Sequence, residues 1–248
     1  MCPHSHPPPN VQRLGTQESF TFDCRSENSC FTDCCRQLEL ALSPYDVLRL
    51  CQATGLKSNE FLDQYVIIEQ EEEDVFPRLY LSMVDDGKES CVFVSPKGCM
   101  VYEHRPGACR IYPMGRAVIR QNDVLSEFFV LLKEDHCHGF SNNVAQTVQS
   151  FSQNQKIGPY NRLNDALASI IQHEDVRLGR TFSREQIDLF ILALYNLDQF
   201  RQELESDQLD HFHPPILDDL VDWDNETLLL YGIDWLNHLL FQNTKSPS

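Results

Sequence analysis

Eight cysteines stand at spacings that suit metal binding. They follow the pattern Cys-x5-Cys-x3-Cys-Cys, then Cys-x7-Cys-x9-Cys, then a single cysteine inside the segment HCHG. The eight are Cys24, Cys30, Cys34, Cys35, Cys91, Cys99, Cys109 and Cys137. Several have charged neighbours, such as Asp23, Arg110 and His136, where a buried apolar side chain has no reason to be. As thiolates they are metal ligands, and we interpret them as such, whereas Cys51 fits the inner face of a helix.

The spacing bears on the metal. Structural zinc usually takes ligands from Cys-x2-Cys knuckles, and this sequence contains none. The wider spacings and the adjacent Cys34 and Cys35 favour a chain that wraps around a larger centre. We therefore expect an iron-sulfur cluster, 4Fe-4S in type, with zinc as the alternative. Eight cysteines exceed the four that one cluster needs, and the sequence leaves open one site or two.

Three arginines stand within the cysteine-rich segment of a chain that is otherwise poor in positive charge: Arg105, Arg110 and Arg116. A thiolate-ligated cluster is usually anionic, and buried anionic charge needs cations or N–H donors nearby. Arg105 and Arg110 are therefore candidate cofactor-binding residues. The alternative is that they pair with acidic groups at the surface. The sequence identifies no catalytic residue.

The charge balance excludes several kinds of partner. Of the 248 residues, 20 are basic and 37 acidic, and the net charge of −17 repels a nucleic-acid backbone and an anionic membrane surface. No run of about 18 apolar residues occurs, and the first residues lack the order of a secretory signal. We expect a cytoplasmic protein that binds neither nucleic acid nor membrane. Thiols stay reduced in that compartment, which favours metal ligation over disulfides.

The elements that position the cysteines predict an α+β fold. A mobile N-terminal segment at 1–19 precedes a cysteine-rich metal-binding domain at 20–140, with helices and a small antiparallel sheet, and a helical region at 141–248. The clearest helix signal has Ser43 as N-cap, Pro44 in the first turn, Asp46 closing a capping box and Gly55 as terminator.

Strands and further helices follow from residue patterns. After an acidic loop at 70–74, the segments 77–83, 91–95 and 99–103 are rich in β-branched and aromatic residues, with turn signals at 85–89 and 96–98. The segment 117–133 fits strands or a helix. Apolar residues three and four apart predict helices within 143–155, 160–174, 183–205 and 225–242, with Ser183 and Asn225 at helix starts and a proline-containing break at 211–217.

Three stretches carry a resemblance to a known family. Phe22 to Cys35, the helix start LSPYDVLRL and the block CVFVSPKGCMVYEHRPGACRIYPM resemble the YkgJ-type cysteine-cluster proteins, whose domain is described as zinc- or iron-chelating. The resemblance covers roughly residues 20–140, with Ser43 where the family usually has threonine. It implies metal chelation by the same eight cysteines, without a settled reaction.

Three functions are consistent with this reading. The leading hypothesis is a protein that holds an iron-sulfur cluster through clustered cysteines. The alternatives are a structural zinc module that binds a protein partner, and a cluster-dependent enzyme that modifies a protein substrate. The last rests on a cysteine pattern similar to that of the flagellin lysine methylases.

Overall fold

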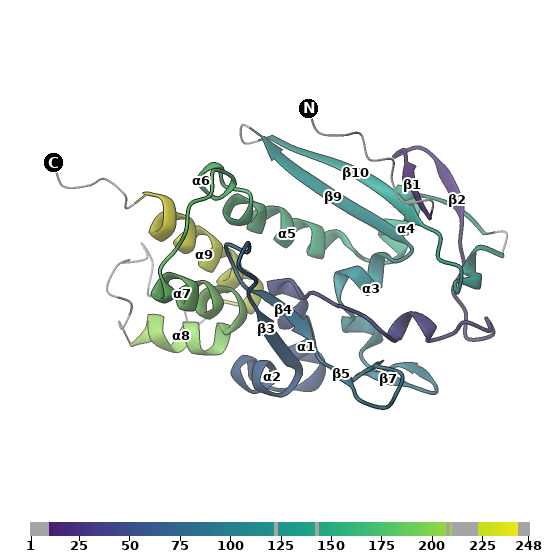
Figure 1. The fold of residues 1–248 in the computed structure, drawn as a ribbon, viewed down its shortest axis with the longest axis horizontal. Coiled ribbons are helices and arrows are strands. Elements are labelled where there is room, and N and C mark those ends of the chain that lie inside the picture. Colours follow the sequence, from purple (N-terminus) through teal and green to yellow (C-terminus); the bar gives the residue numbers. More distant parts are fainter. Residues whose placement is uncertain (1–9, 122–123, 142–143, 207–208, 210–222, 243–248) are drawn as a thin grey trace. The chain divides into compact units, whose positions relative to one another are not determined.

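The computed structural model describes residues 10–121, 124–141, 144–206, 209 and 223–242 (Figure 1). Helices and small antiparallel sheets make up the chain, which confirms the predicted α+β class. It divides into two compact units, one formed by residues 1–38 and 83–159 and the other by residues 39–82 and 160–248. The units interleave along the chain, so they divide the sequence differently from the boundaries predicted after residues 19 and 140.

The first unit contains a three-stranded antiparallel sheet. Its strands are β1 (Val11–Leu14), β10 (Val124–Leu132) and β9 (Met114–Gln121), in that order, and the segment 117–133 therefore forms strands (Figure 1). Phe129 and Leu131 of β10 are buried, as period-two alternation requires. β1 lies inside the segment that was expected to be a mobile lead-in, and the structure instead places it in this sheet.

Short elements make up the rest of the first unit. β2 (Ser19–Thr21) pairs with β11 (Ala145–Thr147), β5 (Met83–Val84) with β6 (Ser90–Cys91), and β7 (Val94–Ser95) with β8 (Gly98–Cys99). The helices are η1 (Asp33–Cys35), η2 (Tyr102–His104), α3 (Gly107–Ile111), η3 (His138–Ser141) and α4 (Val148–Asn154). The cysteines therefore lie on loops, turns and short elements, where bound metal has most to add to folding.

The second unit is mainly helical. Its helices are α1 (Pro44–Thr54), α2 (Ser58–Tyr65), α5 (Gly158–Ile171, whose first two residues fall in the first unit), α6 (Glu174–Arg177), α7 (Arg184–Tyr195), α8 (Leu197–Glu205), α9 (Asn225–Asn237) and a π-helical turn, η5 (His238–Gln242). One hairpin, β3 (Val66–Glu69) with β4 (Arg78–Leu81), completes it. The segment 77–83 thus pairs with β3 through Arg78–Leu81, while its last residue, Met83, begins β5 and pairs with Cys91. Residues 70–74 form the connection between β3 and β4, in which Glu71, Glu72 and Glu73 are exposed as expected, whereas Asp74 is half-buried and pairs with Arg78.

The helix starts follow the predicted caps closely. The Ser43 backbone N–H donates to the Asp46 carboxylate at 2.8 Å, and the Ser43 side chain accepts from the Asp46 N–H at 3.3 Å. Gly55 ends α1 in the left-handed conformation with φ 72°. Ser183 caps α7 in the same way, whereas the N-cap of α9 is Asp224, one residue before the predicted start.

α7 and α9 pack closely at one glycine. A β-carbon on Gly232 of α9 would lie 2.5 Å from the backbone oxygen of Ala193 in α7, so no larger residue fits without a shift. The predicted helix over 183–205 is divided at Asn196 into α7 and α8. The predicted break at 211–217 lies outside the described residues. No helix in the described part of the chain has the length and apolar character to span a membrane.

Candidate metal centre

The segment that carries the first four cysteines is a loop built from tight turns. Backbone N–H groups of Asp33 and Cys35 donate to the carbonyls of Cys30 and Thr32, both at 3.0 Å. Thr32 adopts the left-handed conformation with φ 70°, which is uncommon for a β-branched residue. The Arg36 guanidinium donates to the Thr32 carbonyl at 2.6 Å and stabilises this turn. The turn fixes the backbone positions from which the Cys34 and Cys35 side chains extend.

The segment around Cys137 lies against this loop. The Asp23 N–H donates to the Gly139 carbonyl at 2.9 Å, and the His138 N–H donates to the Cys30 sulfur at 3.2 Å. The His138 Nδ1 and the Ser29 hydroxyl are hydrogen-bonded at 2.6 Å. These three bonds bring Cys137 to a loop more than one hundred residues earlier in the sequence.

Cys24 completes this first group. Burial is the main cause that raises its pKa, to about 11, and the thiols of Cys34, Cys30 and Cys137 add to the effect. An acidic proton is held more tightly when other anionic groups lie close by. The four thiols are therefore neighbours in space.

A second group forms around Cys35. Arg36 bridges Ser90 as an antiparallel pair, and the Gln37 N–H donates to the Glu89 carbonyl at 3.0 Å. This pairing sets Cys35 beside the start of the first cysteine hairpin, at Cys91. The pKa of Cys35 is raised, first by its hydrogen bond to Cys34, then by burial and by the thiols of Cys34, Cys109 and Cys91.

Cys99 joins this second group through the next hairpin. It pairs with Val94 across β7 and β8, and the Met100 N–H donates to the Phe93 carbonyl at 2.9 Å. Burial raises the pKa of Cys91, and among the further causes is the thiol of Cys99. Cys91 and Cys99, eight positions apart in the sequence, therefore lie close enough to interact electrostatically.

The adjacent Cys34 and Cys35 connect the two groups. The Cys35 thiol donates a hydrogen bond to the Cys34 sulfur, which lowers the pKa of Cys34 to about 7. Cys34 also contributes to the raised pKa of both Cys24 and Cys99. The eight cysteines named in the sequence analysis all belong to the first unit, whereas Cys51 belongs to α1 of the second unit.

The thiols are close neighbours without the geometry of a single-ion site. No three Cys, His, Asp or Glu side chains among the described residues lie close enough together to hold one metal ion. No disulfide links the nine cysteines of the described ranges. Of the eight candidate ligands, Cys24, Cys34 and Cys109 are exposed and the others are half-buried. The donor set is all sulfur, which suits zinc or iron-sulfur centres.

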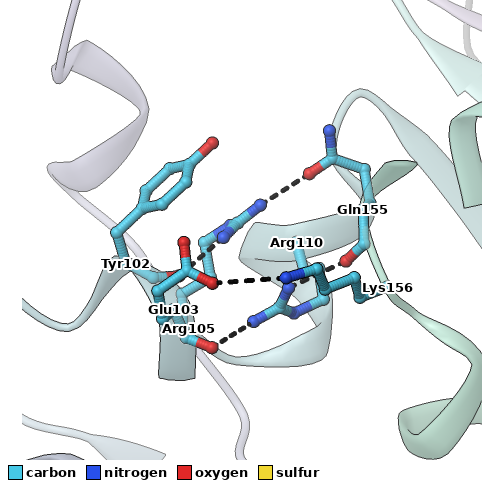
Figure 2. Close-up of polar contacts among 6 residues, drawn as sticks. All are labelled: Tyr102, Glu103, Arg105, Arg110, Gln155 and Lys156. Carbon is cyan, nitrogen blue, oxygen red and sulfur yellow. Dashed lines mark hydrogen bonds and ion pairs between the residues drawn. The ribbon is translucent and has the colours of Figure 1, made fainter. Parts of the chain in front are cut away.

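Arg105 and Arg110 are buried, and Figure 2 shows the polar groups that they contact. Arg105 donates to the Tyr102 carbonyl and to the Gln155 side-chain oxygen, both at 2.5 Å, with its guanidinium carbon 3.8 Å from the centre of the Tyr102 ring. Arg110 donates to the carbonyls of Gln155, at 2.8 Å, and Glu103, at 2.7 Å. Both cations thus bind polar groups of the first unit.

The positive charge of Arg105 interacts electrostatically with the cysteines. Burial is the main cause that lowers its pKa, and among the opposing causes is the thiol of Cys99. Arg105 in turn helps to hold the pKa of Cys99 down against the effect of burial. A buried cation therefore stands close to one candidate ligand.

Two contributors escaped the sequence analysis. Gln155 accepts hydrogen bonds from both arginines, although it follows α4 in a polar stretch with no distinguishing pattern. Burial raises the pKa of the Tyr112 hydroxyl, and hydrogen bonds with Cys137 and Glu134 raise it further. Its position in the CRIYPM block, three residues after Cys109, was the available signal.

Part of the chain matches a known family model. Residues 23–138 match the model of a family named CxxCxxCC, described as a "putative zinc- or iron-chelating domain". The match spans all eight candidate ligands and confirms the resemblance inferred from the cysteine motifs. No curated protein and no solved structure matches the chain.

Proposed function

We propose that residues 23–138, which match the model of the CxxCxxCC family, bind an iron-sulfur centre through cysteine thiolates. One observation carries this proposal: the contact of His138 with the Cys30 sulfur and the bridge between Arg36 and Ser90 bring cysteine-bearing segments together from distant parts of the chain. The cysteines lack the Cys-x2-Cys spacing that structural zinc usually uses, and an iron-sulfur cluster takes thiolates from more widely spaced positions.

The surroundings of the thiols also suit an anionic sulfur-ligated centre. The His138 N–H points at the Cys30 sulfur, and N–H donors to sulfur stabilise its negative charge. Arg105 supplies a buried positive charge near Cys99. Arg110 is held beside it by the carbonyls of Gln155 and Glu103. These residues would orient the ligands and offset the charge of the bound group.

A bound cluster would supply one-electron redox chemistry and a covalent link between loops. The second role follows from where the cysteines lie. They occupy turns, two-residue strands and a five-residue helix, which bury little apolar surface on their own. Metal binding then contributes directly to folding of the first unit, and removal of the metal should lower its stability.

The test is the metal content of protein purified without oxygen. Iron, zinc and acid-labile sulfide are measured on one sample, together with visible absorption. Iron and sulfide in near-equal amounts support the proposal. Stoichiometric zinc without sulfide overturns it in favour of a structural zinc module that binds a protein partner.

Variants then test the ligands. Cys34→Ser and Cys109→Ser should lower both metal content and melting temperature. Cys51→Ser is the matched control because Cys51 belongs to α1 of the second unit, whereas the eight candidate ligands belong to the first unit. Full metal content and an unchanged melting temperature in both ligand variants would show that the assignment is wrong.

A further inference from the structure

We propose that the open edge of β3 binds an extended, basic segment of another protein as an added strand. Strand addition takes its affinity from main-chain hydrogen bonds and its specificity from the flanking side chains. The hairpin of β3 and β4 belongs to the second unit, whereas the eight candidate metal ligands belong to the first. Binding at this edge therefore does not depend on the metal centre.

β3 is the outer strand on its side of a small sheet. β4 lies beside β3 and pairs with it (Figure 1). On the other side of β4, the Leu42 N–H donates to the Leu79 carbonyl at 2.7 Å. The Leu81 N–H donates to the Leu40 carbonyl at 3.0 Å. Within the described ranges, no strand or bridge pairs with the outer side of β3, so this edge of the sheet is open.

The alternation of hydrogen bonds in the hairpin shows which backbone groups point outward. In an antiparallel pair, every second residue bonds to the partner strand, and the residues between them direct their N–H and C=O the other way. The Ser82 N–H donates to the Tyr65 carbonyl at 2.8 Å, so Tyr65 and Ile67 direct these groups toward β4. The N–H and C=O of Ile68 therefore face the open edge. Leu79, which is opposite Ile68, agrees with this because it also bonds away from the hairpin.

Two apolar side chains line the open edge. Ile67 is 48% exposed and Ile68 is 47% exposed, and they lie on opposite faces because successive side chains of a strand alternate. Ile68 shares its face with Leu79, which is buried. Exposed edge strands are usually protected by charges, proline or a covering segment, but the first three residues of β3 are Val-Ile-Ile. An added strand would cover both isoleucines and extend the buried face.

The charges that follow the edge select a basic partner. Exposed glutamates end β3 and continue into its connection to β4: Glu69, Glu71, Glu72 and Glu73. The connection is anchored to the helical core, because the ring of Phe76 stacks on that of Phe190 in α7 with centres 4.4 Å apart. Lysine and arginine at one end of an incoming strand would meet these carboxylates, which favour association and fix its orientation.

Net charge also decides between two occupants of the edge. A second copy of this chain carries the same net charge of −17, so the two copies repel each other. A basic segment is attracted instead. The occupant is therefore a segment of another protein in which β-branched residues, which suit a strand, adjoin several lysines or arginines.

Selection from a library of short random peptides tests the chemistry of the partner. The full-length protein is immobilised, and the peptides that it retains are sequenced. Retained peptides should combine valine, isoleucine or threonine with lysine or arginine. A library without enrichment, or one enriched in acidic peptides, overturns the proposal.

Two proline variants test the backbone of the edge with the most enriched peptide as the probe. Ile68→Pro removes an N–H that faces outward, which an edge strand tolerates, and it should weaken peptide binding about tenfold or more. Ile67→Pro removes an N–H that bonds to β4 and should lower the melting temperature instead. Unchanged peptide binding by Ile68→Pro, or a larger loss of stability in Ile68→Pro than in Ile67→Pro, overturns the proposal.

Charge variants test the choice of partner. Replacement of Glu71, Glu72 and Glu73 by glutamine should weaken binding of the same peptide about tenfold and reduce its dependence on salt. Glu205→Gln with Asp234→Asn is the control, because it removes exposed carboxylates from α8 and α9. Equal affinities for the triple variant and this control show that the glutamates do not recognise the partner.

A second measurement uses only the wild-type protein, so it does not depend on variants that fold. The selected peptide is methylated on one or the other set of alternate backbone nitrogens. Methylation of the set that faces β3 should abolish binding, and methylation of the other set should leave it intact. Equal binding of the two methylated peptides rules out strand addition.

The oligomeric state identifies the competing occupant. Analytical ultracentrifugation of the wild type and of Ile68→Pro shows whether copies of this chain pair through β3. A wild-type dimer that Ile68→Pro converts to a monomer would mean that a second copy occupies the edge, and this overturns the proposal of a basic partner. A wild-type monomer that binds the selected peptide supports it.

Discussion

The guanidinium of Arg110 donates a hydrogen bond to the backbone carbonyl of Gln155 at 2.8 Å, and so ties α3 to the end of α4 (Figure 2). A second bond from Arg110 reaches the Glu103 carbonyl. The two carbonyls belong to segments about fifty residues apart, and the arginine that joins them is 4% exposed. Buried carbonyls that lose their donor cost free energy, since water cannot replace it easily.

Substitution of Arg110 should therefore destabilise the first unit. Arg110→Met keeps much of the side-chain volume and removes both bonds, so we expect a loss of about 2–4 kcal/mol in the free energy of unfolding. Gln155→Ala is the control, because it keeps the backbone carbonyl that Arg110 binds and removes only the side-chain acceptor of Arg105. Urea unfolding at equal metal content measures both. An equal or larger loss in Gln155→Ala would contradict this account.

Substitution of Gly232 should show how tightly α7 and α9 pack. Gly232→Ala places a β-carbon 2.5 Å from the Ala193 oxygen, and such overpacking should cost about 1–3 kcal/mol. Gly158→Ala is the matched control, because a β-carbon there meets nothing within 4 Å. We expect that control to be neutral or slightly stabilising in thermal unfolding. Similar melting temperatures for the two variants would refute the close approach of the helices.

The capping box of α1 predicts a smaller effect. Ser43→Ala removes the acceptor of the Asp46 N–H and should lower the free energy of unfolding by about 1 kcal/mol. Ser43→Thr keeps the hydroxyl and should restore most of the stability. Denaturant midpoints of the three proteins provide the measurement. If threonine is as damaging as alanine, the hydroxyl is not what stabilises this end of the helix.

The Cys51 thiol should resist alkylation at pH values at which an ordinary cysteine reacts. Burial, assisted by Asp198, raises its pKa to about 12. The folded protein therefore keeps this proton where an unfolded cysteine, with a pKa near 9, loses it. Stability from the neutral thiol is complete below about pH 9 and is lost as the pH rises toward 12.

Iodoacetamide labelling at several pH values measures this directly. Cys51 should stay largely unlabelled up to about pH 10 in the folded protein and react as an ordinary cysteine in urea. The same rate in both states at pH 9 would rule out the raised pKa.

Arg105 should slow the loss of bound metal. Arg105→Gln removes the buried positive charge near Cys99, and metal should then transfer to a chelator about tenfold faster. Arg116→Gln is the control, because Arg116 forms an ion pair with Glu127 across β9 and β10 at 2.7 Å. Stopped-flow transfer to a coloured chelator compares the variants. Equal rates for Arg105→Gln and the wild type would remove Arg105 from the metal-binding machinery.

Local features of the fold were readable from the sequence because their causes lie within a few residues. Ser43, Asp46 and Gly55 fix α1 through bonds that span at most four positions, and Ser183 starts α7 in the same way. The alternation in 117–133 admitted a helix or strands, and pairing with β1 decided for strands. That pairing joins residues more than one hundred positions apart, which no local pattern reports.

The candidate metal centre likewise has a part that could be predicted from the sequence and a part that could not. Residue type and spacing were enough to propose all eight cysteines and the two arginines as candidates, since thiolate ligands suit zinc and iron-sulfur centres. Their grouping depends on contacts such as His138 with Cys30 and Arg36 with Ser90, which arise only when distant segments meet. Gln155 was missed for that reason as well.

The order of the two units along the chain has a consequence for synthesis on the ribosome. Tyr45 of α1 donates a hydrogen bond to Glu226 of α9 at 2.6 Å, and α1 also packs against α7. The helical core of the second unit therefore cannot be completed until α9 has been synthesised. Every candidate metal ligand has been synthesised by residue 137, long before α9 begins at Asn225. The growing chain can thus present its complete set of thiols to metal while its first helix still lacks a partner.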